Sequence, residues 1–121
     1  MRTPVVVGLV LAGLAAGCGG GASDADEARD TARSFVGAIR VRDGARACSY
    51  LTENGRTIYT QLGDVPCERG ILAARFPPAA RIGKPQVKGD VATVPLTAPG
   101  GPPVIITLKK QGDTWKVDAT G

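Results

Sequence analysis

The sequence has no histidine, only three cysteines and few aromatic residues, which make up 4% of the chain. A structural zinc site needs about four cysteine or histidine ligands, and a serine or cysteine nucleophile normally needs a histidine base beside it. The scarcity of aromatic rings disfavours a site that stacks sugars or bases. We therefore expect no metal, no cofactor and no catalytic residue in this chain.

The charge of the chain disfavours another class of partner. There are 15 basic and 11 acidic residues, for a net charge of +4, and the basic residues are scattered along the sequence. Without a basic stripe on one face, nucleic-acid binding is not expected. A weak attraction to anionic lipid headgroups remains open, although physiological salt screens it.

Residues 1–17 have the anatomy of an export signal. Arg2 provides a positive start, the run 4–14 is apolar, and small residues follow up to Cys18. A helix that spans a bilayer needs about 20 apolar residues, whereas this apolar run ends sooner. The segment therefore predicts a signal peptide that is removed, and not a membrane-spanning anchor.

The end of this signal resembles the processing site of bacterial lipoproteins. Leu14 precedes three small residues, and Cys18 stands where those proteins carry a thioether-linked diacylglycerol and often a further acyl chain such as palmitate. The usual pattern has leucine three places before the cysteine, whereas here Ala15 holds that place. The resemblance implies a lipid anchor at Cys18 on the extracytoplasmic face of the cell membrane. The alternative is an ordinary secretory signal cut near Ala16 or Ala22, which leaves no lipid.

The number of cysteines agrees with a lipid at Cys18. An odd number of cysteines in an exported chain leaves one thiol outside the disulfides. If Cys18 is acylated, Cys48 and Cys67 remain, 19 residues apart, in a compartment where disulfides persist. We expect one disulfide between them; two buried free thiols, or redox or metal chemistry, are the alternatives.

The chain divides into three parts. Residues 1–17 are the signal peptide, residues 18–23 are the lipidated cysteine and a short glycine-rich tether, and residues 24–121 are one domain. The length of the last part is typical of a single domain. Within it we expect helices over 24–76 and strands over 80–120.

The first helix has the strongest pattern. Its apolar residues recur at three- and four-residue spacing and line one face: Ala25, Ala28, Ala32, Phe35, Val36 and Ile39. Ser23 is placed to cap this helix, and acidic residues fill its first turn. We expect Gly44 to end it in the left-handed conformation that glycine tolerates.

Three shorter helices are expected next, over 45–51, 52–62 and 66–76. Asp43 is a candidate cap for the first of them and Thr52 for the second. A proline suits the first turn of the third. The residues expected to face inward are Ala47, Cys48, Leu51, Ile58, Leu62, Cys67, Ile71, Leu72 and Phe76.

After residue 78 the apolar period becomes two, which predicts antiparallel strands over 82–88, 91–97, 104–109 and 114–119. Pro95 favours an edge strand or a bulge. The inward face is expected to hold Ala92, Val94, Leu96, Val104, Ile106, Leu108, Trp115, Val117 and Ala119, and Asp118 is expected to face outward. Helices followed by strands predict an α+β fold with the helices packed on one side of a curved antiparallel sheet.

Several features together resemble a known fold family: the apolar spacing of the first helix, Arg42-Asp43-Gly44, Ala47-Cys48-x2-Leu51, and the ending Gly112-Asp113-x-Trp115-Lys116-Val117. They resemble the nuclear transport factor two-like, cone-shaped domains of small exported actinobacterial lipoproteins. The resemblance covers roughly residues 24–121. It implies a cone whose open end holds a small apolar ligand, and relatives that dimerise through the exposed sheet face or act as ketosteroid isomerase-like or polyketide cyclase-like enzymes.

An enzyme of that fold would need an acid or base inside the cone and a donor to a developing oxyanion. Asp90 and Asp113 fall in expected turns and Asp118 on the outer face. Tyr50 and Tyr59 can donate a hydrogen bond into a cavity, or they can be core residues with the hydroxyl at the rim. We therefore expect no enzyme; an isomerase- or cyclase-like enzyme that uses tyrosine and aspartate groups is the alternative.

Eight residues are candidates for the lining of a pocket: Phe35, Ile39, Tyr50, Leu51, Tyr59, Ile106, Leu108 and Trp115. The same residues are needed to fill the core of so small a domain, so a filled core is the alternative. The sequence thus predicts a non-catalytic, lipid-anchored protein of the cell envelope. Its expected partner is a small apolar ligand, another protein or a second copy of the chain.

Overall fold

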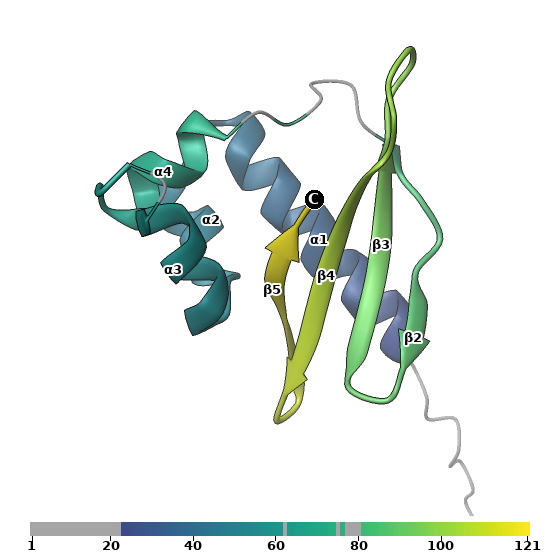
Figure 1. Ribbon diagram of the computed structural model, residues 1–121. Coiled ribbons are helices and arrows are strands. Elements are labelled where there is room, and N and C mark those ends of the chain that lie inside the picture. The colour runs from purple at the N-terminus through teal and green to yellow at the C-terminus, as the bar shows by residue number, and fades with distance from the viewer. Residues whose placement is uncertain (1–22, 62, 75, 77–80) are drawn as a thin grey trace, which may run out of the picture.

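The computed structural model describes residues 23–61, 63–74, 76 and 81–121. Within them, four helices pack on an antiparallel five-stranded sheet, which confirms the expected α+β fold (Figure 1). The helices are α1 (Asp24–Arg40), α2 (Gly44–Ser49), α3 (Glu53–Gln61) and α4 (Cys67–Ala73). The strands are β1 (Arg81–Ile82), β2 (Gln86–Lys88), β3 (Val91–Thr97), β4 (Val104–Gln111) and β5 (Thr114–Thr120). In Figure 1, α1 runs across one face of the sheet, and α2, α3 and α4 gather beside β5.

Helix α1 forms where the apolar spacing predicts it. The Ser23 Oγ accepts a hydrogen bond from the Asp26 N–H at 3.1 Å, which confirms the expected cap. The buried residues of α1 lie on the face toward the sheet: Ala28, Ala32, Phe35, Val36 and Ala38. This face packs on β3 and β5, so α1 supplies much of the cover for the sheet.

The expectation that Gly44 ends α1 in the left-handed conformation is wrong. The chain turns earlier, and Arg42 takes the left-handed backbone, with φ 58°. Gly44 is the first residue of α2, and the Asp43 carboxylate caps this helix by accepting from the Arg46 N–H at 3.0 Å. A glycine is needed there because an added Cβ would overlap the Glu68 carbonyl group of α4.

Helices α2 and α4 pack against each other and are joined by the predicted disulfide. Cys48 on α2 is bonded to Cys67, the first residue of α4. Helix α4 ends before Phe76, which was expected to belong to it. Phe76 instead packs edge-on against Phe35 of α1, with the ring centroids 5.9 Å apart.

Helix α3 begins as predicted but turns a different face inward. The Thr52 Oγ1 accepts from the Gly55 N–H at 3.0 Å and caps the helix. The buried residues of α3 are Gly55 and Tyr59, whereas Ile58, expected to face inward, is 36% exposed. The inward face is therefore set by close packing of α3 on β5 and α4, which overrides local apolar spacing. Leu62, the other residue expected inward, lies outside the described residues.

Strand β3 pairs with β1 and β2 on one side and with β4 on the other. One strand was expected over 82–88; the structure has two, separated at residues 83–85. The gap lies beside Pro95, which has no N–H to donate to a neighbouring strand. The Gly83 N–H donates to the Pro95 carbonyl oxygen at 2.8 Å. The break between β1 and β2 thus accommodates Pro95, although β3 is not an edge strand.

The pairing of β4 with β5 contains a bulge that the apolar pattern does not reveal. Thr107 pairs with Ala119 and Leu108 pairs with Val117, so Asp118 has no partner on β4. The phase of β5 reverses at this point, because an extra residue shifts every following side chain to the other face. Ala119, expected to face inward, therefore lies on the outer face beside Thr107. Asp118 lies on the same side of the sheet as Lys109 but is buried there by Thr52 and Asn54.

The free edge of β5 is covered by the segment between α2 and α3. The Val117 N–H donates to the Tyr50 carbonyl at 2.7 Å, and the Thr52 N–H donates to the Val117 carbonyl at 2.8 Å. Leu51 thereby forms a parallel bridge with Val117. An uncovered edge strand invites pairing with another chain, so this segment protects the sheet on that side.

The hydrophobic core contains residues of both the helices and the sheet, from Ala28 on α1 to Val117 on β5. The disulfide and the helix caps lie in the same part of the chain. The contacts described here all lie within residues 23–121. Among the described helices, none combines the length and the apolar composition needed to cross a bilayer.

Candidate functional site

The eight candidate pocket residues lie in or against the hydrophobic core. Six are at most 3% exposed: Phe35, Leu51, Tyr59, Ile106, Leu108 and Trp115. Ile39 and Tyr50 are partly buried and pack against these six. None of the eight lines any of the three hollows seen along the described residues. In the structure these residues therefore form part of the packed hydrophobic core.

The two tyrosine hydroxyls have different surroundings. The Tyr59 Oη lies 2.7 Å from the Thr120 Oγ1 on β5. Burial raises the pKa of the Tyr59 phenol, and the hydrogen bond with Thr120 opposes that rise. The Arg46 side chain lowers the pKa of the Tyr50 phenol, and Ser34 adds to the effect. Tyr59 thus joins α3 to β5, and Tyr50 belongs to a polar contact of α2 with α1.

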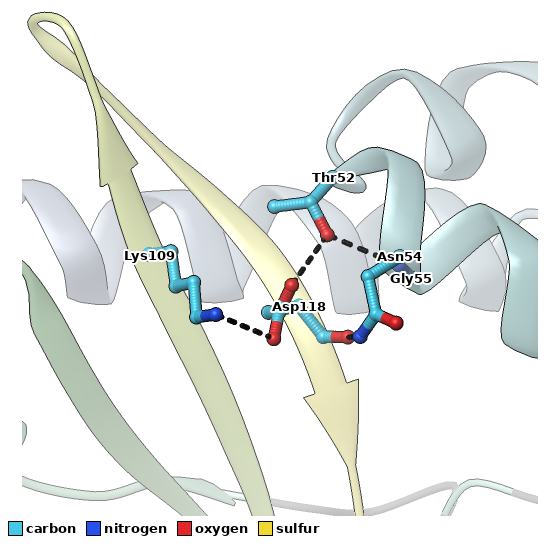
Figure 2. Close-up of polar contacts among 5 residues, drawn as sticks. All are labelled: Thr52, Asn54, Gly55, Lys109 and Asp118. Atoms are coloured by element: carbon cyan, nitrogen blue, oxygen red, sulfur yellow. Dashed lines mark hydrogen bonds and ion pairs between the residues drawn. The ribbon is translucent and has the colours of Figure 1, made fainter.

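Asp118 is the centre of a polar cluster between β5, α3 and β4 (Figure 2). Its Oδ1 accepts from the Thr52 hydroxyl at 2.7 Å, and the Lys109 Nζ lies 3.6 Å from its Oδ2. The Asn54 Nδ2 donates to the Asp118 carbonyl oxygen at 3.3 Å. Since the Thr52 hydroxyl also accepts from the Gly55 N–H, a single oxygen joins the carboxylate to the first turn of α3.

This cluster is built to hold α3 on β5. Asp118 is 8% exposed, and each of its carboxylate oxygens has a partner. A general base must be within hydrogen-bond reach of a substrate proton, and Asp118 lines none of the three hollows. We therefore describe the Thr52–Asp118 contact as a clamp between the two elements.

Sequence reasoning missed this clamp. Strict alternation along β5 places Asp118 outside, because the bulge depends on pairing with β4. The signal available was Thr52, whose position predicts a helix cap. It gives no indication that the same hydroxyl also donates to a carboxylate 66 residues away.

Replacing Asp118 with alanine is expected to lower the free energy of unfolding by about 1.5–2 kcal/mol, because a hydrogen bond to a charged group is worth about that much. The matched control, Asp118→Asn, keeps an acceptor for Thr52 and loses only the exposed ion pair with Lys109, worth less than about 1 kcal/mol. Chemical denaturation measures both variants. Equal losses would contradict the clamp and would assign the effect to Lys109.

The start of α1 is tied to the sheet by an ion pair. The Lys110 Nζ on β4 lies 2.9 Å from the Asp24 Oδ1. This hydrogen bond lowers the pKa of the Asp24 carboxyl and raises the pKa of the Lys110 ammonium. The Trp115 indole also lowers the pKa of Asp24. The contact holds the start of α1, which follows the predicted tether, on the sheet.

The largest of the three hollows is a groove of about 440 Å³ between the start of α1 and the link from β1 to β2. It is lined by Ala25, Asp26, Arg29, Ile82, Gly83, Lys84 and Pro85. The Arg29 Nη2 donates to the Ile82 carbonyl at 3.2 Å, and the Arg29 Nε is buried without a hydrogen-bond partner. Lys84 and Asp26 also belong to the lining, so the groove combines charged groups of both signs with an apolar wall.

The described residues hold no group of three or more histidine, cysteine, aspartate or glutamate side chains arranged to bind a metal ion. Cys18, the expected lipidation residue, lies outside the described residues, as does the rest of 1–22. The signal peptide and the anchor therefore stay predictions.

No family model matches the sequence. No curated protein matches it either. Among solved structures, the chain is similar to an uncharacterized cystatin-fold protein from Novosphingobium aromaticivorans, with 19% identity and a TM-score of 0.46 over 78% of this chain and 95% of that chain. At this level of similarity no residue role passes from that protein to this one.

Proposed function

We propose that this chain is an exported, lipid-anchored protein of the cell envelope that acts by binding and not by catalysis. The observation that supports the anchor is the disulfide, which uses Cys48 and Cys67. Cys18 is the cysteine left over, at the end of an apolar, signal-like segment. A cysteine outside the disulfides of an exported chain needs another use, and acylation after signal cleavage provides one.

The position of the fold in the chain agrees with attachment at Cys18. Helix α1 begins at Asp24, so five residues separate it from the proposed lipid. A flexible tether of that length reaches about 12 Å. The domain is thereby held close to the membrane, with the start of α1 nearest to it.

Binding is favoured over catalysis by the roles of the polar residues. The Asp118 carboxylate and the Tyr59 hydroxyl are engaged in contacts between α3 and β5. The groove beside Arg29, in contrast, offers Lys84, Asp26 and an apolar wall to a small ligand with both polar and apolar groups. We also place the domain with the small cone-shaped nuclear transport factor two-like domains; a long α1 packed across an antiparallel sheet is in keeping with this.

The anchor is tested by expressing the full chain and its Cys18→Ser variant in a bacterial host that processes lipoproteins. We expect the parent chain to incorporate a clickable fatty acid and to partition into the detergent phase of Triton X-114. The variant should incorporate none, because serine provides no thioether, and mass spectrometry should find it either uncleaved or released without a lipid. An Ala15→Leu variant, which restores the usual pattern before the cysteine, serves as the matched control and should label at least as well as the parent.

One outcome would contradict the anchor directly. If the parent chain is unlabelled and its mature N-terminus, read by mass spectrometry, lies near Ala16 or Ala22, the segment is an ordinary secretory signal. The fold, the disulfide and the groove would be unaffected by that result.

A further inference from the structure

Three lysines and a valine form a row across the outer face of the sheet. Strand pairing sets Lys88 on β2 beside Val91 on β3, Val91 beside Lys109 on β4, and Lys109 beside Lys116 on β5. Val91 precedes the buried Ala92 on β3 and so faces away from α1, and the residues paired across from it lie on the same face. At the usual strand spacing the row is about 14 Å wide. We call these four residues the lysine row.

The row keeps an excess of positive charge. Lys109 and Lys116 lie directly opposite each other, an arrangement of like charges that destabilises a sheet. The Lys109 ammonium pairs with Asp118 at 3.6 Å, and the Lys116 ammonium donates to the Ser49 carbonyl, which carries no charge. Asp118 therefore balances the charge of Lys109, and the charges of Lys88 and Lys116 remain on the row.

The surface around the row is open. Val91 is 38% exposed, although it is a large apolar residue. A hollow of about 180 Å³ lies beside it, lined by Gln86, Lys88, Val91 and Thr93. Figure 1 shows the described helices behind the sheet or beside β5, so none of them covers this face.

The row also lies at the end of the sheet where the predicted tether joins the domain. Lys110, next to Lys109 in the chain, points to the opposite face and holds Asp24 at the start of α1. The acidic residues of the first turn of α1 are therefore on the helix side together with Lys110, and the lysine row is on the open side. The row and the predicted tether thus lie at the same end of the domain.

We propose that the lysine row docks on anionic lipid headgroups and turns the open face of the sheet toward the membrane. Phosphate groups complement the ammonium groups of Lys88 and Lys116, and the exposed Val91 can reach the interfacial region between headgroups. This inference goes beyond the proposed anchor and does not require it, because the row belongs to residues 23–121. When Cys18 is acylated, the short tether keeps the row near the headgroups, so a weak contact is sufficient to orient the domain.

The test uses residues 23–121, which span the described fold, and measures binding to vesicles by co-sedimentation at about 0.1 M ionic strength, where the Debye length is about 10 Å. We expect binding to vesicles that contain phosphatidylglycerol, little binding to phosphatidylcholine alone, and weakening as salt increases. Lys88→Gln with Lys116→Gln should weaken binding about fivefold for each lysine. This pair leaves Lys109 and the Asp118 clamp unchanged.

The matched control removes the same charge from the helix layer, with Arg33→Gln and Arg69→Gln, which are exposed on α1 and α4. Its binding should change by less than about twofold, because charges farther from the headgroups than a Debye length are screened. The unfolding midpoint of the lysine variant should stay close to that of the parent, since removal of the repulsion offsets loss of the exposed Lys116–Ser49 hydrogen bond. A fall in the midpoint would show that the lysines serve the fold, and would overturn the proposal.

Three further results would overturn it. Equal losses in the two double variants would mean a general attraction by net charge. Equal binding to both kinds of vesicle would mean an apolar contact. Binding to a soluble polyanion such as heparin without binding to phosphatidylglycerol vesicles would assign the row to a partner other than lipid. Failure of acylation at Cys18 affects none of these readings, because the tested residues do not include it.

Discussion

Replacing Cys48 and Cys67 together with alanine is expected to lower the unfolding midpoint of the domain by about 12–24 °C. The disulfide closes a loop with a sequence separation of 19, and closing a loop of that size is worth about 3 kcal/mol. In a domain of about 100 residues, each kcal/mol shifts the midpoint by about 4–8 °C. Loss of this one bond should therefore produce one of the largest changes that a substitution can cause here.

The position of the disulfide explains why its effect should be large. Helix α2 has six residues and α4 has seven, and isolated helices shorter than about 12 residues are marginal in water. These helices pack on each other and on α1 and α3, and have little direct contact with the sheet. The disulfide therefore stabilises the part of the domain that is farthest from the sheet.

The measurement is a thermal unfolding scan of residues 23–121 by circular dichroism, with and without a reducing agent. Removing both cysteines avoids a free thiol that can form bonds between molecules. The oxidised parent should melt highest, and the reduced parent should melt with the variant. If all three samples melt within about 2 °C of one another, the bond contributes little and the helices are held by packing alone.

The elements that were predicted well are those with local signals. Helix α1 has an apolar face, a serine cap and acidic residues in its first turn, all within 17 residues. Strand β3 alternates buried Ala92, Val94 and Leu96 with less buried residues, as a sheet with one covered face requires. The Cys48–Cys67 bond followed from counting, because assigning Cys18 to lipid leaves a single pair.

The elements that were predicted poorly depend on contacts between distant segments. The bulge at Asp118 exists only because β5 pairs with β4 on one side and with residues 50–52 on the other. Ile58 has the right spacing for a core residue, but the close approach of α3 to α4 turns Gly55 and Tyr59 inward instead. Local spacing contains no information about such distances.

The residue types of the candidate pocket do not distinguish a cavity from a filled core. Residues such as Phe35, Leu108 and Trp115 suit an apolar cavity and a packed interior equally well. The groove beside Arg29, in contrast, is formed by the start of α1 and a link between two strands more than 50 residues later. The lysine row likewise depends on register, since its members come from four strands.

Replacing Gly70 with alanine is expected to lower the free energy of unfolding by about 3 kcal/mol, the upper part of the usual range for overpacking. Gly70 lies on α4 where it meets α3, and an added Cβ would overlap the Tyr59 carbonyl oxygen. Because the obstacle is backbone, no change of rotamer can relieve the overlap. Helices α3 and α4 would have to move apart, which disturbs the packing of the buried Tyr59 ring and its hydrogen bond with Thr120.

Gly37→Ala is the matched control, since it makes the same chemical change in the interior of α1. An added Cβ there meets no atom within 4 Å, and alanine is favoured over glycine in a helix by about 1 kcal/mol. Chemical denaturation should therefore find the Gly37 variant at least as stable as the parent and the Gly70 variant much less stable. A Gly70 variant as stable as the parent would show that α3 and α4 do not approach as closely as described. In that case the inward turn of Tyr59, which we attribute to this approach, would need another cause.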